Sequence, residues 1–148
     1  MKYLLLLLTG LAISPAFAQS KHYLSLKNTI NLANGNVTNV NQEKAVYFNL
    51  HVWEKTDDPN DKGLMTLQDV PFNSNDYSRR MYYESFKIYS IQLNNDGVYY
   101  YWTVDQVANS QVVLFEVNLN SAPSIIVMNR YAPSGGNKVL KRTTYYLE

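Results

Sequence analysis

The stretch Ile88–Val104, IYSIQLNNDGVYYYWTV, decides the fold that the sequence predicts. Apolar and polar residues alternate on both sides of Asp96-Gly97, as in two half-buried strands joined by a tight turn. Asp-Gly is a strong indicator of a two-residue hairpin turn. With that turn, one face of the hairpin pairs Leu93 with Tyr100, Ile91 with Trp102 and Tyr89 with Val104.

Turns of other lengths change these partners. A four-residue turn over Asn94–Gly97 keeps the same faces. A three-residue turn would place Gln92 opposite Tyr100 and Ser90 opposite Trp102, and a slip of one residue turns every side chain over. We therefore predict that Tyr100 and Trp102 lie in the core, and that Tyr99 and Tyr101 point outward.

The segment AVYFNLHVWEK, residues 45–55, alternates more cleanly than the stretch before it. One face carries the apolar side chains Val46, Phe48, Leu50 and Val52. The other face carries Tyr47, Asn49, His51 and Trp53.

Alternation of this kind recurs through residues 19–148, except between Gly63 and Arg80, where the pattern is irregular and indicates a long connection. The sequence predicts one all-β domain, an antiparallel sandwich or small barrel of about seven strands. One helical alternative remains, because Tyr82, Phe86, Tyr89 and Leu93 also have helical spacing.

The first residues, MKYLLLLLTGLAISPAFAQS, have the three parts of a secretory signal peptide. Lys2 gives a positive start, an apolar run follows, and Ala16-Phe17-Ala18 is a small-x-small cleavage site. We expect residues 1–18 to be removed and the chain to be periplasmic or secreted. The composition, rich in Lys and Asn, suggests a bacterial source.

The charge and the cysteine count exclude several classes of function. The chain has 13 basic and 12 acidic residues, so removal of Lys2 leaves a mature net charge of zero. A neutral chain has no overall field to attract nucleic acid or an anionic membrane. It has no cysteine, which excludes disulfides, thiolate metal sites and a catalytic thiol.

No motif for catalysis or for a cofactor is present, and we expect a protein without enzymatic activity and without a cofactor. The loop after Trp53 has a partial resemblance to the spacing of a calcium loop, with Asp58, Asn60 and Asp69 as oxygen donors. Lys62 occupies a position where a ligand oxygen is required. We therefore expect a solvated turn there and no metal.

The outward aromatic residues are the best candidates for a binding site. Tyr99 and Tyr101 lie two apart on one strand, and exposed Tyr and Trp rings are enriched where proteins bind. The same face can also be covered by another part of the chain. The candidate partner-binding or ligand-binding residues are Tyr99, Tyr101, Tyr47, His51 and Trp53.

Three functions are compatible with these observations. The first is a non-catalytic binding domain that recognises a protein partner, as an inhibitor or an assembly subunit, through the outward aromatic face. The second is a small-molecule or carbohydrate binder that uses a barrel interior or the tyrosine face. The third is a small outer-membrane barrel. The length of the chain argues against it, because the chain is short for about eight membrane-spanning strands.

Overall fold

The computed structural model describes residues 19–34, 37–71, 82–107, 111–133 and 136–148. The predicted signal peptide, residues 1–18, lies outside the described residues. Within them the chain forms eight strands, one more than the approximate count expected from the sequence. They are β1 (Gln19–Leu32), β2 (Val37–Val52), β3 (Gly63–Pro71), β4 (Tyr82–Leu93), β5 (Tyr99–Asp105), β6 (Val112–Asn118), β7 (Ile125–Tyr131) and β8 (Val139–Leu147).

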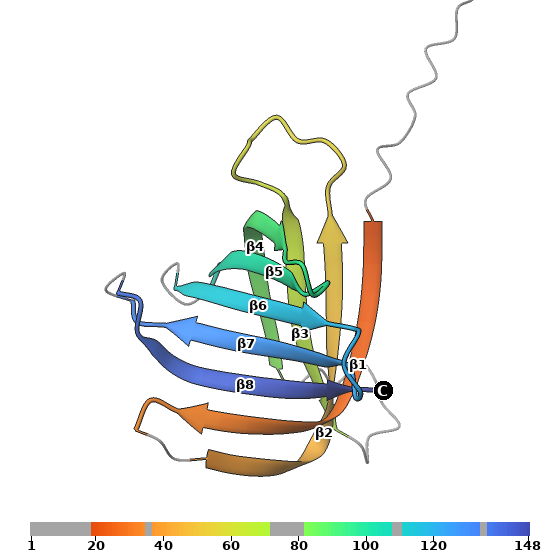
Figure 1. Cartoon of the computed structure of the whole chain (residues 1–148), viewed down its shortest axis with the longest axis vertical. Helices are drawn as coiled ribbons and strands as arrows, with labels where there is room; N and C mark the ends of the chain where they lie inside the picture. The colour runs from red at the N-terminus through yellow and green to blue at the C-terminus, as the bar shows by residue number, and fades with distance from the viewer. Residues whose placement is uncertain (1–18, 35–36, 72–81, 108–110, 134–135) are drawn as a thin grey trace, which may run out of the picture.

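The strands form one antiparallel sheet in which each strand pairs with the next along the chain, and β1 also pairs with β8. The ring is therefore closed, and the fold is a barrel and not a sandwich. Figure 1 shows β6, β7 and β8 crossing the upright β3 and the upright half of β2. β1 curves between the two directions, and its register shifts between Ser25 and Lys27, a bulge that accounts for the bend.

Two predictions about the middle of the chain are wrong. The first half of the supposedly irregular Gly63–Arg80 segment is strand β3, which pairs with both β2 and β4. The alternation of β3 is difficult to recognise in the sequence, because only a few apolar residues alternate there with the polar Thr66 and Gln68. The helical alternative over residues 82–93 is also wrong, since these residues form β4.

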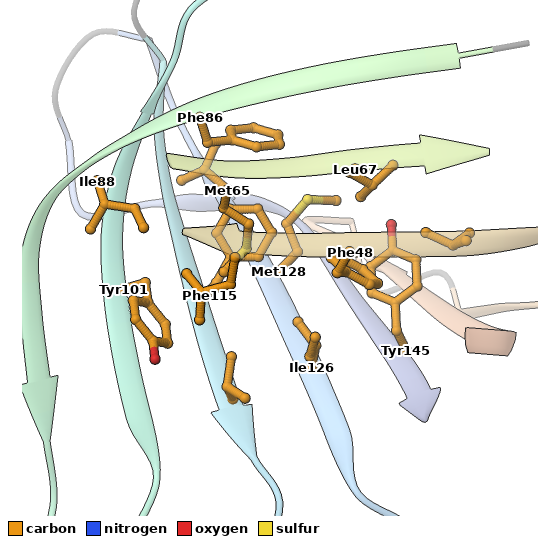
Figure 2. Packing of buried hydrophobic residues seen from close by; sticks show 14 residues of the cluster. Phe48, Met65, Leu67, Phe86, Ile88, Tyr101, Phe115, Ile126, Met128 and Tyr145 are labelled. Atoms are coloured by element: carbon orange, nitrogen blue, oxygen red, sulfur yellow. The ribbon is translucent and has the colours of Figure 1, made fainter. Parts of the chain in front are cut away.

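The core fills the inside of the barrel. Phe48, Phe86 and Phe115 are fully buried, and edge-to-face contacts join Phe86 to Phe115 and Phe48 to Tyr145, each with ring centroids 4.9 Å apart. Figure 2 shows these rings with Met65 and Met128 between the strands. Burying each such side chain contributes roughly 1.5–3 kcal/mol relative to exposure, so these side chains stabilise the closed ring.

The hairpin between β4 and β5 has the three-residue turn that the sequence analysis rejected. Leu93 pairs with Tyr99, and the Gly97 amide donates to the Asn94 carbonyl over 3.1 Å. Gly97 has a φ of 77°, the left-handed conformation that closes a three-residue turn. The Asn94 side-chain oxygen accepts from the amides of Asp96 and Val98, at 3.0 and 2.9 Å, which holds this turn in place.

A bulge in β4 makes this register compatible with an apolar interior. The pairing skips Tyr89, because Ile88 lies opposite Thr103 and Ser90 lies opposite Trp102. The extra residue moves Ile91 to the same side as Ile88. Both halves of β4 therefore present apolar residues to the core despite the three-residue turn.

The predicted orientation of the aromatic residues in β5 is consequently wrong. Tyr101 faces the interior and is 4% exposed, and Tyr99 also points inward, packed against the core. Tyr100 and Trp102 lie on the outside of the barrel. By contrast, the two predicted faces of β2 are confirmed, since Val46, Phe48 and Leu50 are buried inside.

Candidate functional site

The two ends of the barrel interior carry different side chains. We call the end where β1, β5 and β7 begin the tyrosine end, because Tyr23, Tyr99 and Tyr101 face inward there. We call the opposite end, where these strands finish, the arginine end, after Arg130. The aromatic core lies between the two.

At the tyrosine end, aromatic rings and one ammonium group are in contact. The rings of Tyr99 and Tyr101 are stacked, with centroids 6.0 Å apart and an interplanar angle of 18°. The Lys21 ammonium lies 5.7 Å from the centroid of the Tyr99 ring, within the range of a cation–π interaction. Tyr23, Tyr99 and Lys21 are half-buried, so this group is partly accessible to solvent while Tyr101 is not.

The phenols at this end influence one another. Burial raises the pKa of Tyr101, and its neighbours Tyr23 and Tyr99 raise it further. Burial also raises the pKa of Tyr23, with Tyr99 adding to the effect. Both hydroxyls therefore stay protonated at neutral pH and can donate hydrogen bonds.

The structure separates the predicted binding residues into two groups. Tyr99 and Tyr101 are inside the barrel, whereas Tyr47, His51 and Trp53 lie on the outer face of β2 or just beyond its end. Trp53 is 37% exposed, and its indole N–H donates to Asp61 over 2.9 Å. The five residues therefore do not form one site.

The loop between β2 and β3 is a turn stabilised by its own side chains. An Asp58 carboxylate oxygen accepts from the Asn60 amide at 2.8 Å, and the other lies 3.4 Å from the Lys87 ammonium. These contacts lower the pKa of Asp58, chiefly the hydrogen bond from Asn60. Asp69 belongs to strand β3, so the structure does not gather Asp58, Asn60 and Asp69 into a calcium loop.

The arginine end holds a buried ionic cluster that the sequence analysis missed. The Arg130 guanidinium forms ion pairs with Glu84 and with Asp105, the latter at 3.2 Å, and lies 5.6 Å from the Phe86 ring. Asp105 is 2% exposed and Glu84 is buried. Burial alone would lower the pKa of Arg130, but Glu84 and Asp105 raise it above its ordinary value, so the guanidinium remains charged.

The sequence did contain an indication of this cluster. Two of the charged residues lie two positions from an apolar residue that faces the core: Glu84 before Phe86, and Arg130 after Met128. Asp105 follows Thr103 and Tyr101 on the inward face in the same way. A charged residue in phase with an apolar face is a candidate for a buried ion pair.

Among the residues that the structure describes, no group of three or more His, Asp or Glu side chains is placed to hold a metal ion. The described residues also contain no helix long and apolar enough to cross a membrane. No protein-family model matches this chain, and neither the curated proteins nor the solved structures give a match.

Proposed function

We propose that this chain is a non-catalytic binding domain that takes a small ligand at the tyrosine end of the barrel. The observation that supports this most is the Tyr99–Tyr101 stack beneath the Lys21 ammonium, in which Tyr99 and Lys21 are partly accessible to solvent. The opposite end is a poorer candidate, because its charged groups are buried and already paired. This function is the second of the three that the sequence left open, a small-molecule or carbohydrate binder. The tyrosine face that would bind the ligand lies inside the barrel.

The chemistry of the tyrosine end favours one class of ligand. Stacked phenol rings present flat apolar faces, which pack against aromatic rings or the CH face of a sugar. Lys21 and the hydroxyls of Tyr23 and Tyr101 supply a positive charge and hydrogen-bond donors. The ligand that fits both features has a flat apolar part and an anionic or hydroxyl-bearing edge, as in an aromatic acid or a uronic acid.

The fluorescent dye anilinonaphthalene sulfonate tests this, since it combines a flat aromatic system with one anionic group. We expect saturable binding to the mature chain that weakens at least tenfold in Lys21→Met and in Tyr99→Leu. Lys138→Met and Tyr83→Leu are matched controls, because both residues are exposed and lie near the arginine end. Equal affinity in all five proteins would contradict the proposal.

A second candidate function is recognition of a protein partner by the outer face of β2. The observation that favours it is the outward orientation of Tyr47, His51 and Trp53, as expected from the sequence. Capture of a specific periplasmic protein by the wild type should be lost in Tyr47→Ala/Trp53→Ala and kept in Tyr83→Ala. Unchanged capture by the double variant would rule out this face.

The distribution of polar residues supports a binding domain over an outer-membrane barrel. Membrane barrels present apolar side chains to lipid and polar ones to the lumen. Here the aromatic and aliphatic core is inside, while outward positions include Asn49, Lys87 and Glu116. We infer export to the periplasm or the medium from the leader-like sequence at residues 1–18.

The proposal that the domain is non-catalytic rests on the acidic groups. A general acid or base must come within hydrogen-bond reach of the substrate, and its pKa is tuned for that task. Glu84 and Asp105 instead share one guanidinium and are shielded from solvent. Both carboxylates are engaged by Arg130 inside the barrel, which supports a domain without acid–base catalysis.

A further inference from the structure

The two histidines of the chain lie side by side on the outer face of the barrel, although 29 positions separate them in the sequence. His22 in β1 is opposite Asn49, and His51 in β2 is opposite Ser20, so the imidazoles form a diagonal pair across neighbouring strands. Their ring centroids are 6.3 Å apart and the rings are edge to face, with an interplanar angle of 81°.

The Nδ1 atom of each ring is held by a hydrogen bond. His22 Nδ1 lies 2.7 Å from the Asn49 side-chain oxygen, and His51 Nδ1 lies 2.8 Å from the Ser20 hydroxyl. The Asn49 amide nitrogen donates to the Thr66 hydroxyl at 3.2 Å, which directs the Asn49 oxygen toward His22. Because that oxygen can only accept, His22 Nδ1 carries the proton.

The proton on Nδ1 leaves the lone pair of the neutral His22 ring on Nε2. Metal-binding histidines are usually arranged in this way, with one nitrogen hydrogen-bonded to a neighbouring group and the other bound to the ion. No described residue makes a hydrogen bond to Nε2 of either histidine. His22 is exposed and His51 is half-buried, so an ion can reach the pair from solvent.

We propose that His22 and His51 form a two-histidine site for a divalent transition-metal ion on the outer face of β1 and β2. The ion would bind the Nε2 atom of each ring, at the usual zinc–imidazole or copper–imidazole distance of about 2.0–2.1 Å. Water fills the remaining positions, since no third His, Asp or Glu in the described residues joins the pair. Imidazole nitrogens bind Cu²⁺, Ni²⁺ and Zn²⁺, and Cu²⁺ has the highest affinity of the three.

This site is independent of the small-ligand site. His22 and Tyr23 are consecutive in β1, and they point to opposite sides of the sheet. A failure of dye binding at the tyrosine end therefore leaves the metal site untouched, and the reverse also holds.

The test is titration of the metal-free mature chain with Cu²⁺, followed by calorimetry. We expect one ion per chain, with affinity reduced at least tenfold in His22→Gln and in His51→Gln and lost in the double variant. The double variant retains the chain's N-terminal amine and every other donor. Unchanged affinity in it would mean an adventitious ion only and would overturn the proposal.

Two further measurements do not depend on deleting a ligand. Electron paramagnetic resonance of the Cu²⁺-loaded wild type should show coupling to two imidazole nitrogens, and coupling to one or none would overturn the proposal. Asn49 is a positioning residue, because it orients His22 without binding the ion. Asn49→Ala should therefore weaken Cu²⁺ binding about 10–100-fold, and Asn49→Asp should restore it. Equal affinity in wild type and Asn49→Ala would remove the role assigned to Asn49.

Discussion

The tyrosine end and the arginine end of the barrel place polar groups in the same apolar interior, but they accommodate them differently. At the arginine end, Glu84 and Asp105 are buried and both are paired with Arg130. At the tyrosine end, phenols and one ammonium lie on the inward face, and most of them are half-buried.

The difference follows from the cost of removing a charge from water. A buried charge without a partner costs several kcal/mol, so the arginine end has to be neutralised by ion pairs. A phenol is neutral at pH 7 and carries a large apolar ring, so it tolerates partial burial without an opposite charge. Figure 2 shows the Tyr101 and Tyr145 hydroxyls pointing in opposite directions, one toward each end. The charged groups of the arginine end are therefore engaged with one another, and the tyrosine end is the one that we propose binds a ligand.

The largest expected effect comes from removing the guanidinium. Arg130→Met leaves two buried carboxylates without their common partner and should lower the free energy of unfolding by about 3–5 kcal/mol. Urea denaturation measures this loss. Arg142→Met is the control, because Arg142 is exposed and its contact with Glu116 spans 3.8 Å, and such a surface pair contributes at most about 1 kcal/mol.

A triple variant sharpens the same point. Arg130→Met/Glu84→Leu/Asp105→Leu removes the charges together, and we expect its stability to return to within about 1 kcal/mol of the wild type, because an apolar replacement of a buried ion cluster is often neutral or stabilising. If the triple variant is as unstable as Arg130→Met, packing by the Arg130 side chain matters more than its charge.

Alkaline pH should destabilise both ends, through Tyr101 and Tyr145. Burial raises the pKa of both phenols above the ordinary value of 10.0, and Glu84 and Asp69 add to the effect on Tyr145. The unfolded chain releases these two phenol protons at a lower pH than the folded chain. The stability that the protonated phenols contribute is therefore fully present below pH 10, and it is lost as the pH rises toward their pKa values in the folded chain. The free energy of unfolding should fall by about 1 kcal/mol per pH unit for each tyrosine above pH 10.

Denaturant titrations between pH 9 and pH 11 measure this slope. Tyr145→Phe should reduce it by the contribution of one tyrosine. Tyr83→Phe is the control, because Tyr83 is 48% exposed and should leave the slope unchanged. A flat stability profile up to pH 11 would contradict the assignment.

Replacing Gly97 tests the turn that places Tyr99 and Tyr101 at the tyrosine end. Its φ of 77° is left-handed, and an added Cβ would lie 2.4 Å from the Asn120 side-chain nitrogen. Gly97→Ala should therefore cost roughly 1–2 kcal/mol, measured by thermal or urea denaturation. Gly136→Ala is the control, since an added Cβ there meets nothing within 4 Å. Equal stability of the two variants would show that the turn tolerates a side chain.

The smallest effect on stability is expected at Lys21. Lys21→Met removes a partly exposed cation–π contact worth about 0.5–1 kcal/mol, so the urea midpoint should scarcely move. The same variant should lose dye affinity, as described above. A large loss of stability would mean that Lys21 supports the fold instead of a ligand.

The sequence predicted the faces of the second half of β2 correctly because residues 46–52 alternate without interruption. It failed at the β4–β5 hairpin because two compensating irregularities were invisible in the pattern. Asp96-Gly97 is compatible with turns of two or three residues, and the Asn94 side chain favours the longer one. The bulge at Tyr89 then restores an apolar inner face, so alternation alone could not reveal the slip.

The sites depend on contacts between distant parts of the chain. His22 and His51 have no shared motif, and only the register of β1 against β2 brings them together. The same holds for Glu84, Asp105 and Arg130, which come from three strands. In this fold, the sequence of one strand shows which of its residues could form a site. Which residues of other strands they meet depends on how the sheet closes.

Closure of the ring by β1 and β8 has a consequence for how the chain folds. The first and last of the described strands are hydrogen-bonded from Ser25 opposite Leu147 to Leu32 opposite Lys141. Contacts between residues so distant in the sequence have a large entropic cost of loop closure, and they lower the folding rate. Translation must reach β8 before β1 can pair with its second neighbour, so an emerging chain has an unpaired strand edge until β8 has been made.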